Sequence, residues 1–363
     1  MKTEINRKNI IEALKTSKTF GADAIRISGN QFIAVAGRNT LEIEIDAHGA
    51  IDVTIDAYTL KDLQKAIGAK KTAFVEIADN GNGTATIDGM IRLKTINEKI
   101  EMKFVDGSAE LYELKTAQLL DAIRGTLPFV SDNETAPILC GINMRTHGRR
   151  LTFESTNRHY AGQYTIETAT LAIKDESSTF DTNAMKAVAT LKTDAENVRI
   201  FRGEKRTSFV FGADTATISI AHMDGVYPDF TKIYLNAHSS NLSNIVFNRS
   251  ELLDTLKLHT KTTDDKKSFI TKLNYTHADE IATITDKEEN FNARLKVRTN
   301  ALNKDYSIAF NGKYMLNAVQ AVEYDSVYMN VDEKSAMNPI LIMDVRKHGE
   351  TFEILILPYK VQS

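Results

Sequence analysis

The segment Ile10-Ile11-Glu12-Ala13-Leu14 decides the fold, because two further versions of it occur along the chain. Leu119-Leu120-Asp121-Ala122-Ile123 and Leu252-Leu253-Asp254-Thr255-Leu256 repeat its order of two apolar residues, an acid, a small residue and an apolar residue. Each version follows a short alternating stretch that is typical of a β-strand. The same strand and helix pattern at three places predicts a module present in three copies.

A second amphipathic segment follows in each third of the chain, at 60–67, 184–188 and 314–319. Alternating apolar and polar residues, as in 41–45 and 352–357, predict strands with one buried face. We therefore expect an α+β protein in which each module packs two helices on antiparallel sheets. The expected modules are 1–107, 108–240 and 241–363.

The composition of the 363 residues is that of a globular protein, with 42% hydrophobic and 26% charged residues. The net charge of -3 excludes a uniformly basic nucleic-acid coat but allows a local basic patch. Cys140 is the only cysteine, which excludes an intrachain disulfide and a four-cysteine zinc site. No apolar run is long enough to span a membrane, and the first ten residues contain no signal core, so we expect a cytoplasmic protein with no membrane association.

Recognisable catalytic motifs are missing from the sequence, and no cofactor is expected. The glycines in Asp79-Asn80-Gly81-Asn82-Gly83 favour a hairpin turn over a phosphate loop, because no Gly-Lys-Ser/Thr follows. Cys140 lies in an apolar stretch and is expected to be a small buried residue rather than a nucleophile. His222, Asp224 and Asp229 could serve acid–base chemistry or Mg²⁺, although Asp-Gly and Pro-Asp around them favour a turn.

Positive charge gathers on the expected helices. Together the segments 7–18, 58–71, 115–126, 181–192, 249–261 and 311–322 carry a net charge of +10, which leaves -13 for the rest of the chain. Solvated helix faces are one explanation. If the helices share one surface instead, that surface would bind phosphates without reading sequence. The candidate DNA-binding residues are Lys8, Lys15, Lys18, Lys61, Lys65, Arg124, Lys186, Lys192 and Lys313.

Four stretches together resemble the bacterial sliding clamp family, the beta subunit of DNA polymerase III. They are Met223 to Phe230 (D-G-x-[FY]-P-[DN]-[YF] in the family), Phe310 to Ala318 (F-N-x-x-Y-L-x-[DE]-[AV]), Glu134 to Gly141 (E-x-R-P-[IV]-L-x-G) and Ile356 to Val361 ([IV]-[ML]-P-[ML]-[RK]-[LIV]). Their order and spacing fit the family over the whole chain, and the match is weakest in the first third.

The resemblance implies a head-to-tail homodimer with three domains per chain, whose six domains form a ring with the helices facing a central hole. Such a ring encircles double-stranded DNA without sequence preference and tethers the DNA polymerase, so the resemblance implies a processivity factor and not an enzyme. Polymerase and clamp loader would bind through linear peptide motifs. An extended peptide with apolar anchors would lie in a pocket between the second and third modules.

By the same resemblance, the pocket takes its residues from both modules. They are Leu139, Ser155, Asn157, Arg158, Tyr160, Pro228, Lys232, Ile233, Asn311, Tyr314, Met337, Leu355, Leu357, Pro358 and Tyr359. The sequence departs from the family at Ala136, where arginine is usual, and over 155–161, where A-T-D-[GS]-[HY]-R-L-A is usual. Arg158 and His159 invert a basic pair there, and Tyr160 replaces a small apolar residue.

Two other classes of protein remain as alternatives. One is a scaffold of tandem modules that forms no ring and whose basic helices are merely solvated. The other is a metal-dependent hydrolase that uses His222, Asp224 and Asp229. A central opening wide enough for duplex DNA would distinguish the ring from both.

Overall fold

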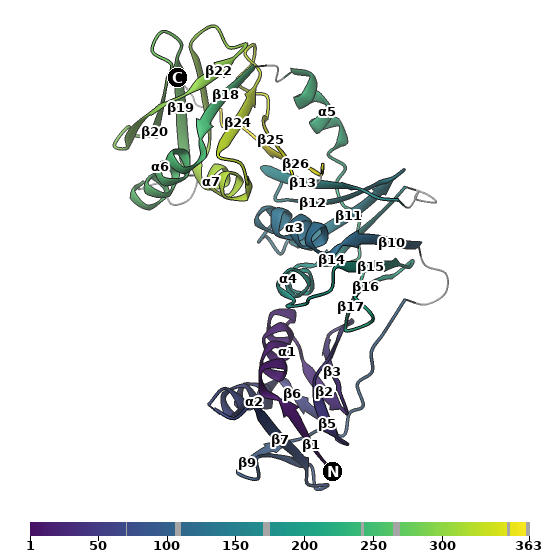
Figure 1. Ribbon diagram of the computed structural model, residues 1–363. Coiled ribbons are helices and arrows are strands. Elements are labelled where there is room, and N and C mark those ends of the chain that lie inside the picture. The colour runs from purple at the N-terminus through teal and green to yellow at the C-terminus, as the bar shows by residue number, and fades with distance from the viewer. Residues whose placement is uncertain are drawn as a thin grey trace. The chain divides into compact units, whose positions relative to one another are not determined.

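The computed structural model describes residues 1–69, 71–105, 110–169, 175–240, 243–263, 269–346 and 349–360 (Figure 1). The predicted module boundary after residue 107, the first residue of the third predicted module (241), Lys70 and the last three residues lie outside these ranges. The chain divides into two compact units. Unit 1 contains Met1–Arg124, Thr146–Arg150 and Thr168–Asp224, and unit 2 contains Gly125–Arg145, Leu151–Glu167 and Gly225–Ser363.

Short polar side chains set the starts of most helices. Asn6, Asp56, Asp181, Asn248 and Asn311 each accept a hydrogen bond from a backbone N–H in the first turn of the helix that follows. The helices are α1 (Arg7–Phe20), α2 (Ala57–Gly68), α3 (Thr116–Thr126), α4 (Thr182–Thr190), α5 (Thr231–Ser240), α6 (Arg249–Thr262) and α7 (Gly312–Ala321), with 3-10 turns η1 (Leu127–Phe129) and η2 (Pro137–Cys140). Within the described ranges, no helix is long and apolar enough to cross a membrane.

Two antiparallel sheets form the framework of unit 1. Their strand orders are β5-β1-β7-β8-β9 and β10-β15-β16-β17-β4-β3-β2-β6. The strands are β1 (Lys2–Asn6), β2 (Ala24–Ser28), β3 (Gln31–Ala36), β4 (Asn39–Glu44), β5 (Ala47–Gly49), β6 (Asp52–Asp56), β7 (Phe74–Asp79), β8 (Thr84–Ile87), β9 (Ile91–Lys94), β10 (Glu110–Lys115), β14 (Glu176–Asp181), β15 (Asn197–Arg202), β16 (Arg206–Phe211) and β17 (Ala216–Ala221).

Unit 2 is built in the same way, from the strand run β11-β12-β13-β26-β25-β24-β18-β22 and the sheet β21-β20-β19-β23. The strands are β11 (Gly141–His147), β12 (Arg150–Thr156), β13 (Tyr160–Glu167), β18 (Ser243–Asn248), β19 (Ile270–Thr276), β20 (Ile281–Asp286), β21 (Asn292–Lys296), β22 (Arg298–Asn300), β23 (Tyr306–Asn311), β24 (Ser326–Val331), β25 (Ile340–Val345) and β26 (Thr351–Ile356).

One strand order recurs three times. The first strand of each repeat precedes a helix and opens the series β1-β7-β8-β9, β10-β15-β16-β17 and β18-β24-β25-β26. A second series, β6-β2-β3-β4, recurs as β23-β19-β20-β21 and in part as β11-β12-β13. The α+β prediction is confirmed, and the repeated order agrees with the prediction of a triplicated module.

The six predicted helices are present, at α1, α2, α3, α4, α6 and α7, but the sequence analysis missed α5. Only Tyr234 and Ala237 of α5 are buried, so its apolar pattern is too sparse to stand out beside the preceding turn residues. The predicted hairpin at 79–83 joins β7 and β8. Gly81 and Gly83 there have φ of +70° and +76°, which glycine adopts at low cost.

The core of unit 2 leaves no room for a side chain at Gly162. A Cβ there would lie 2.7 Å from a ring carbon of Phe129, which is fully buried. We expect Gly162→Ala to lower the free energy of unfolding by about 1–3 kcal/mol, since an overpacked core must shift. Thermal and urea unfolding would measure the loss. The control Gly68→Ala, at the end of α2, meets no atom within 4 Å and should be neutral or slightly stabilising, and equal effects of both changes would contradict this account.

Candidate functional site

The residues predicted to bind DNA are all exposed. The lysines of unit 1 on α1, α2 and α4 also have no hydrogen-bond or ion-pair partner for their amines among the described residues. They are Lys8, Lys15, Lys18, Lys61, Lys65 and Lys186. Lys8, Lys15 and Lys18 stand at helical spacing on one face of α1, and Lys61 and Lys65 are one turn apart on α2. These amines are available to an anionic ligand.

Two other predicted DNA-binding residues hold helices together. The guanidinium of Arg124 donates to the carbonyl oxygen of Ala189 at 2.7 and 3.1 Å, which caps the end of α4. The amine of Lys192 lies 3.3 Å from the carboxylate of Glu12 on α1. Both residues line, with Lys8, a groove of about 950 Å³ in unit 1. In unit 2 the amine of Lys313 lies 5.8 Å from the ring centre of Phe269.

The helix charge is less uniform than the sequence analysis expected. Lys115 lies on β10 and Lys192 lies beyond the end of α4. In α3 the charge of Arg124 is balanced by Asp121, so this helix carries no net charge. The positive charge is instead concentrated on α1, where Arg7, Lys8, Lys15 and Lys18 face one acid, Glu12.

In unit 2 the tight turn between β12 and β13 packs against α7. The Tyr160 ring stacks on the Tyr314 ring with centres 4.2 Å apart and planes within 7°. The His159 ring lies 6.4 Å from the Tyr314 ring and nearly parallel to it. The backbone N–H of Leu357 donates to the carbonyl of His159 at 2.9 Å. The turn therefore joins α7 to the chain that follows β26.

Tyr160, which replaces a small family residue, is itself held firmly. Its hydroxyl donates to the carbonyl of Pro128 and accepts from the side chain of Asn317 at 3.2 Å. Burial raises the pKa of Tyr160 to about 12, so the hydroxyl stays protonated and can donate. His159 and Asn317 were not among the predicted site residues. Asn-Ala at 317–318 stands where the family has [DE]-[AV], a departure that could have drawn attention to Asn317.

The predicted pocket residues divide by exposure. Leu139, Ser155, Tyr160, Asn311 and Leu355 are buried. Asn311 caps α7, and Leu355 packs with Tyr234 of α5. The exposed residues are Arg158, Pro228, Lys232, Ile233, Met337 and Leu357. The half-buried residues are Asn157, Tyr314, Pro358 and Tyr359. The second and third groups can contact a ligand directly, while the first group supports them.

Helix α5 carries Lys232 and Ile233, and its start is tied to β11 and β12. The guanidinium of Arg145 donates to the Thr231 hydroxyl at 2.7 Å and lies 3.3 Å from the Glu154 carboxylate. The side chain of Asn143 donates to Glu154 at 2.7 Å. Burial raises the pKa of Glu154, whereas Arg145 and Asn143 favour its charged form. At the other end of α5, His238 contacts Glu353 at 2.6 Å.

The side chains of the possible metal site have structural roles. In unit 1, His222 bonds the Thr207 hydroxyl at 2.9 Å and the Glu204 carbonyl at 3.1 Å, and Asp224 lies 3.7 Å from Arg38. In unit 2, Asp229 accepts a hydrogen bond from the backbone N–H of Thr231 at 2.9 Å. Within the described ranges no three His, Cys, Asp or Glu side chains are grouped to hold a metal ion.

Cys140 is half-buried rather than buried, so this detail of the prediction is wrong. It ends η2, and its thiol lies 3.4 Å from the carbonyl of Asn133. Burial and the nearby acids Glu134 and Asp132 raise the pKa of the Cys140 thiol. A protonated thiol is a weak nucleophile, which agrees with the expected structural role.

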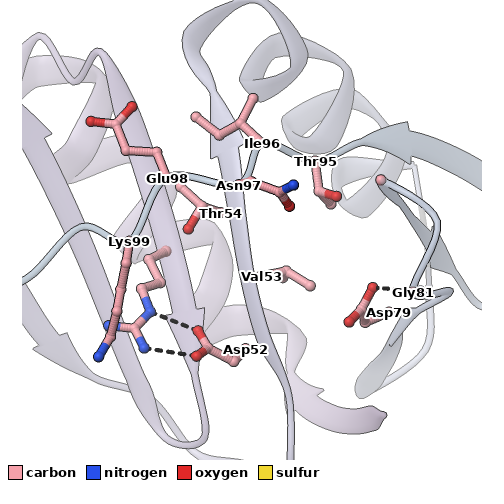
Figure 2. Close-up of a pocket in the computed structure, with 12 residues that line it drawn as sticks. Asp52, Val53, Thr54, Asp79, Gly81, Thr95, Ile96, Asn97, Glu98 and Lys99 are labelled. Atoms are coloured by element: carbon pink, nitrogen blue, oxygen red, sulfur yellow. Dashed lines mark hydrogen bonds and ion pairs between the residues drawn. The ribbon is translucent and has the colours of Figure 1, made fainter.

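Figure 2 shows a polar pocket of about 350 Å³ in unit 1. Arg26 binds both carboxylate oxygens of Asp52, at 2.6 and 2.8 Å, and these hydrogen bonds hold the pKa of Asp52 below its ordinary value. The segment 95–99, which follows β9, forms one wall. The β7–β8 turn contributes Asp79 and Gly81 to another.

Family models match most of the chain. The model described as the central domain of the DNA polymerase III beta subunit matches residues 113–229. The model described as the C-terminal domain of the same subunit matches residues 239–360.

Individual proteins give the same result. The beta sliding clamp of Synechococcus elongatus is 21% identical over 326 residues, which are 88% of this chain and 84% of that protein. The beta sliding clamp of Bacillus subtilis is 26% identical over 253 residues, which are 68% and 64% of the two chains. The crystal structure of the B. subtilis DNA polymerase sliding clamp has a TM-score of 0.82 at 18% identity and covers 100% of both chains. A putative DNA polymerase III beta subunit from Eubacterium rectale has a TM-score of 0.81 at 17% identity and covers 99% of this chain and 100% of its own.

The half-buried imidazole of His222 should make stability depend on pH. Burial and the charge of Arg202 lower its pKa to about 4, while in the unfolded chain it returns to about 6.5. The stability due to neutral His222 is therefore complete above pH 6.5 and is lost as pH falls towards 4. His222→Gln should reduce the loss in unfolding free energy between pH 7 and pH 4.5 by about 1–2 kcal/mol, measured by urea unfolding. The exposed control His277→Gln should leave the loss unchanged, and an unchanged loss in His222→Gln would disprove the account.

Proposed function

The chain belongs to the family of the DNA polymerase III beta subunit, and we propose that it acts as a sliding clamp. Two copies form a head-to-tail ring that encircles duplex DNA in the cytoplasm and tethers the polymerase. Each copy contributes three modules, with boundaries near residues 107 and 240. The family is a processivity factor and not an enzyme.

The observation that carries the proposal is the pairing of strands where modules meet. Strand β17 pairs with β4 in unit 1, and β26 pairs with β13 in unit 2. In the repeated series, β9 is the counterpart of β17 and β26, and β21 is the counterpart of β4 and β13. Each of β9 and β21 has one paired neighbour among the described residues. An edge strand is a template for another chain. Pairing β9 of each copy with β21 of the other closes a ring with two equivalent joints.

The register of the observed pairs gives the register of this joint. Ile218 of β17 faces Leu41 of β4, and Ile354 of β26 faces Gly162 of β13. When the repeated series are aligned, Ile91 of β9 corresponds to Ile218 and Ile354. It would therefore face the start of β21 near Phe291. An antiparallel pair then brings Arg92 and Lys94 beside the acidic β20–β21 turn, which contains Glu288 and Glu289.

A helix face supports the same joint. On α1, which packs against α4, Ala13 and Thr16 are 1% and 6% exposed. The corresponding residues of α6 are Thr255 and Leu258, if both helices are aligned on their capping residues Asn6 and Asn248. Leu258 is 54% exposed. In unit 1 this face of α1 packs against α4, which is the second helix of its repeat. The equivalent second helix of the other copy is α2, so α2 of the second copy would cover this face of α6.

The pocket of Figure 2 is the place where the turn of the second copy would lie. In unit 1 the β3–β4 turn contacts the residues that follow β17, through Arg38, His222 and Asp224. The residues that follow β9 are those that form the pocket wall at 95–99. In this wall Lys99 lies 3.1 Å from the carboxylate of Glu101 and follows Glu98, so the wall itself carries no net charge.

The exposed lysines of α1, α2 and α4 would form the inner wall of the ring. Amines without protein partners can bind phosphates, and their attraction is independent of base sequence. The partner site in unit 2 would take peptides of the polymerase and of the clamp loader. Exposed apolar residues such as Ile233, Met337 and Leu357 can receive the apolar anchors of an extended peptide.

Charge reversal tests the joint. Lys94→Glu and Glu288→Lys should each raise the Kd of the dimer by about two- to tenfold, because each places like charges together. Sedimentation equilibrium measures the Kd. The double variant should recover most of the affinity. Lys304→Glu, at an exposed residue outside the joint, is the matched control. A wild-type protein that stays monomeric at micromolar concentration would contradict the ring and favour the scaffold alternative.

Retention on DNA tests encirclement. Loaded protein should remain on nicked circular DNA and leave the same DNA after it is cut to a linear form, because a ring can slide off a free end and cannot slide off a circle. The triple change Lys15→Glu, Lys61→Glu and Lys65→Glu should lower retention on the circle several-fold at about 50 mM salt and less at high salt. Lys304→Glu is again the control. Equal retention on both DNA forms would be incompatible with topological binding.

A further inference from the structure

Arg158 has a backbone conformation that is unfavourable for any residue with a side chain. Its φ is +77°, in the left-handed region. The corresponding residue of the β3–β4 turn is Gly37, with φ of +54°. Glycine adopts this conformation without steric cost, so arginine makes the β12–β13 turn less stable than glycine would.

Hydrogen bonds within the turn hold Arg158 in this conformation. Its N–H donates to the hydroxyl of Thr156 at 3.0 Å, and the side chain of Asn157 accepts from the N–H groups of His159 and Tyr160 at 3.0 and 3.1 Å. The stack of Tyr160 on Tyr314 and the hydrogen bond from Leu357 to His159 fix the turn from outside. Arg158 is therefore presented at a rigid tip.

The guanidinium of Arg158 does not stabilise the fold through any contact with the described residues. It is exposed and makes no hydrogen bond, ion pair or ring contact with any residue that the structure describes. The Arg158 side chain thus makes no contact that would offset its strained backbone. Such strain is characteristic of residues that bind a ligand. Lys232, also on the proposed partner site of unit 2, is exposed as well, and its charge acts on Asp229.

We propose that Arg158 determines the specificity of the partner site, by binding the carboxylate of an acidic residue beside the apolar anchor of a partner peptide. The inference rests on the proposed function of that site. A guanidinium binds carboxylates and phosphates through paired N–H donors. The peptide carboxylate is favoured here, because the neighbouring His159 lies beside the ring of Tyr314 and is hydrogen-bonded to the backbone of Leu357, whose side chain is exposed and can receive an apolar anchor. A DNA phosphate is the competing ligand.

Two fluorescein-labelled ten-residue peptides test the proposal. Both carry the same Leu and Phe anchors, and they differ only in having Glu or Gln on either side of the anchors. By fluorescence anisotropy at about 100 mM salt, the wild-type ring should bind the Glu peptide at least about fivefold more tightly. Arg158→Gly should bind both peptides within about twofold of each other, with unchanged affinity for the Gln peptide, and its unfolding midpoint should rise because the strain is gone.

Further variants separate charge from structure. Arg158→Lys should keep part of the preference for the Glu peptide, and Lys304→Ala should keep all of it. Equal affinities in the wild type would overturn this inference and leave the peptide site itself standing. Binding of neither peptide would count against the proposed site as well. If Arg158→Gly lowers retention on circular DNA and leaves the peptide preference intact, the arginine serves DNA and the proposal is wrong.

Discussion

Backbone hydrogen bonding at the ends of the sheets governs this molecule. Each module ends in strands whose outer N–H and C=O groups need partners, and modules meet where such edges pair, at β17 with β4 and at β26 with β13. Two edges without such a pair, β9 and β21, carry Arg92, Lys94, Arg294 and Lys296 as exposed residues. Charged edges resist indiscriminate pairing with other strands.

The basic residues on the helices fall into two groups with different roles. Arg124 and Lys192 serve the packing of α3, α4 and α1, although their sequence positions suggested a role in DNA binding. The lysines that remain without partners are the ones that can attract phosphates over a distance, in a chain with a net charge of -3. A clamp benefits from such diffuse attraction, because a strong local contact would hinder sliding.

The proposed partner site combines a fixed frame with an exposed tip residue. Tyr160, Tyr314 and Asn317 form a frame held by the ring stack and by the hydrogen bond from Asn317 to the Tyr160 hydroxyl, and the tip of the β12–β13 turn lies beside this frame. Arg158 occupies that tip at the expense of local stability.

Sequence by itself determined the repeated modules and the six predicted helices, with their ends placed to within a few residues. These follow from local periodicity and from capping side chains such as Asn6 and Asn311, which act within a few residues. Helix α5 was missed because its stability comes from contacts with Glu353, Leu355 and Arg145, which are distant in the sequence. The tertiary structure alone decided which lysines are free of partners, which edge strands remain open, and that Tyr160 stacks on Tyr314. Those properties depend on contacts between segments far apart in the chain, and no local pattern of residues encodes such contacts.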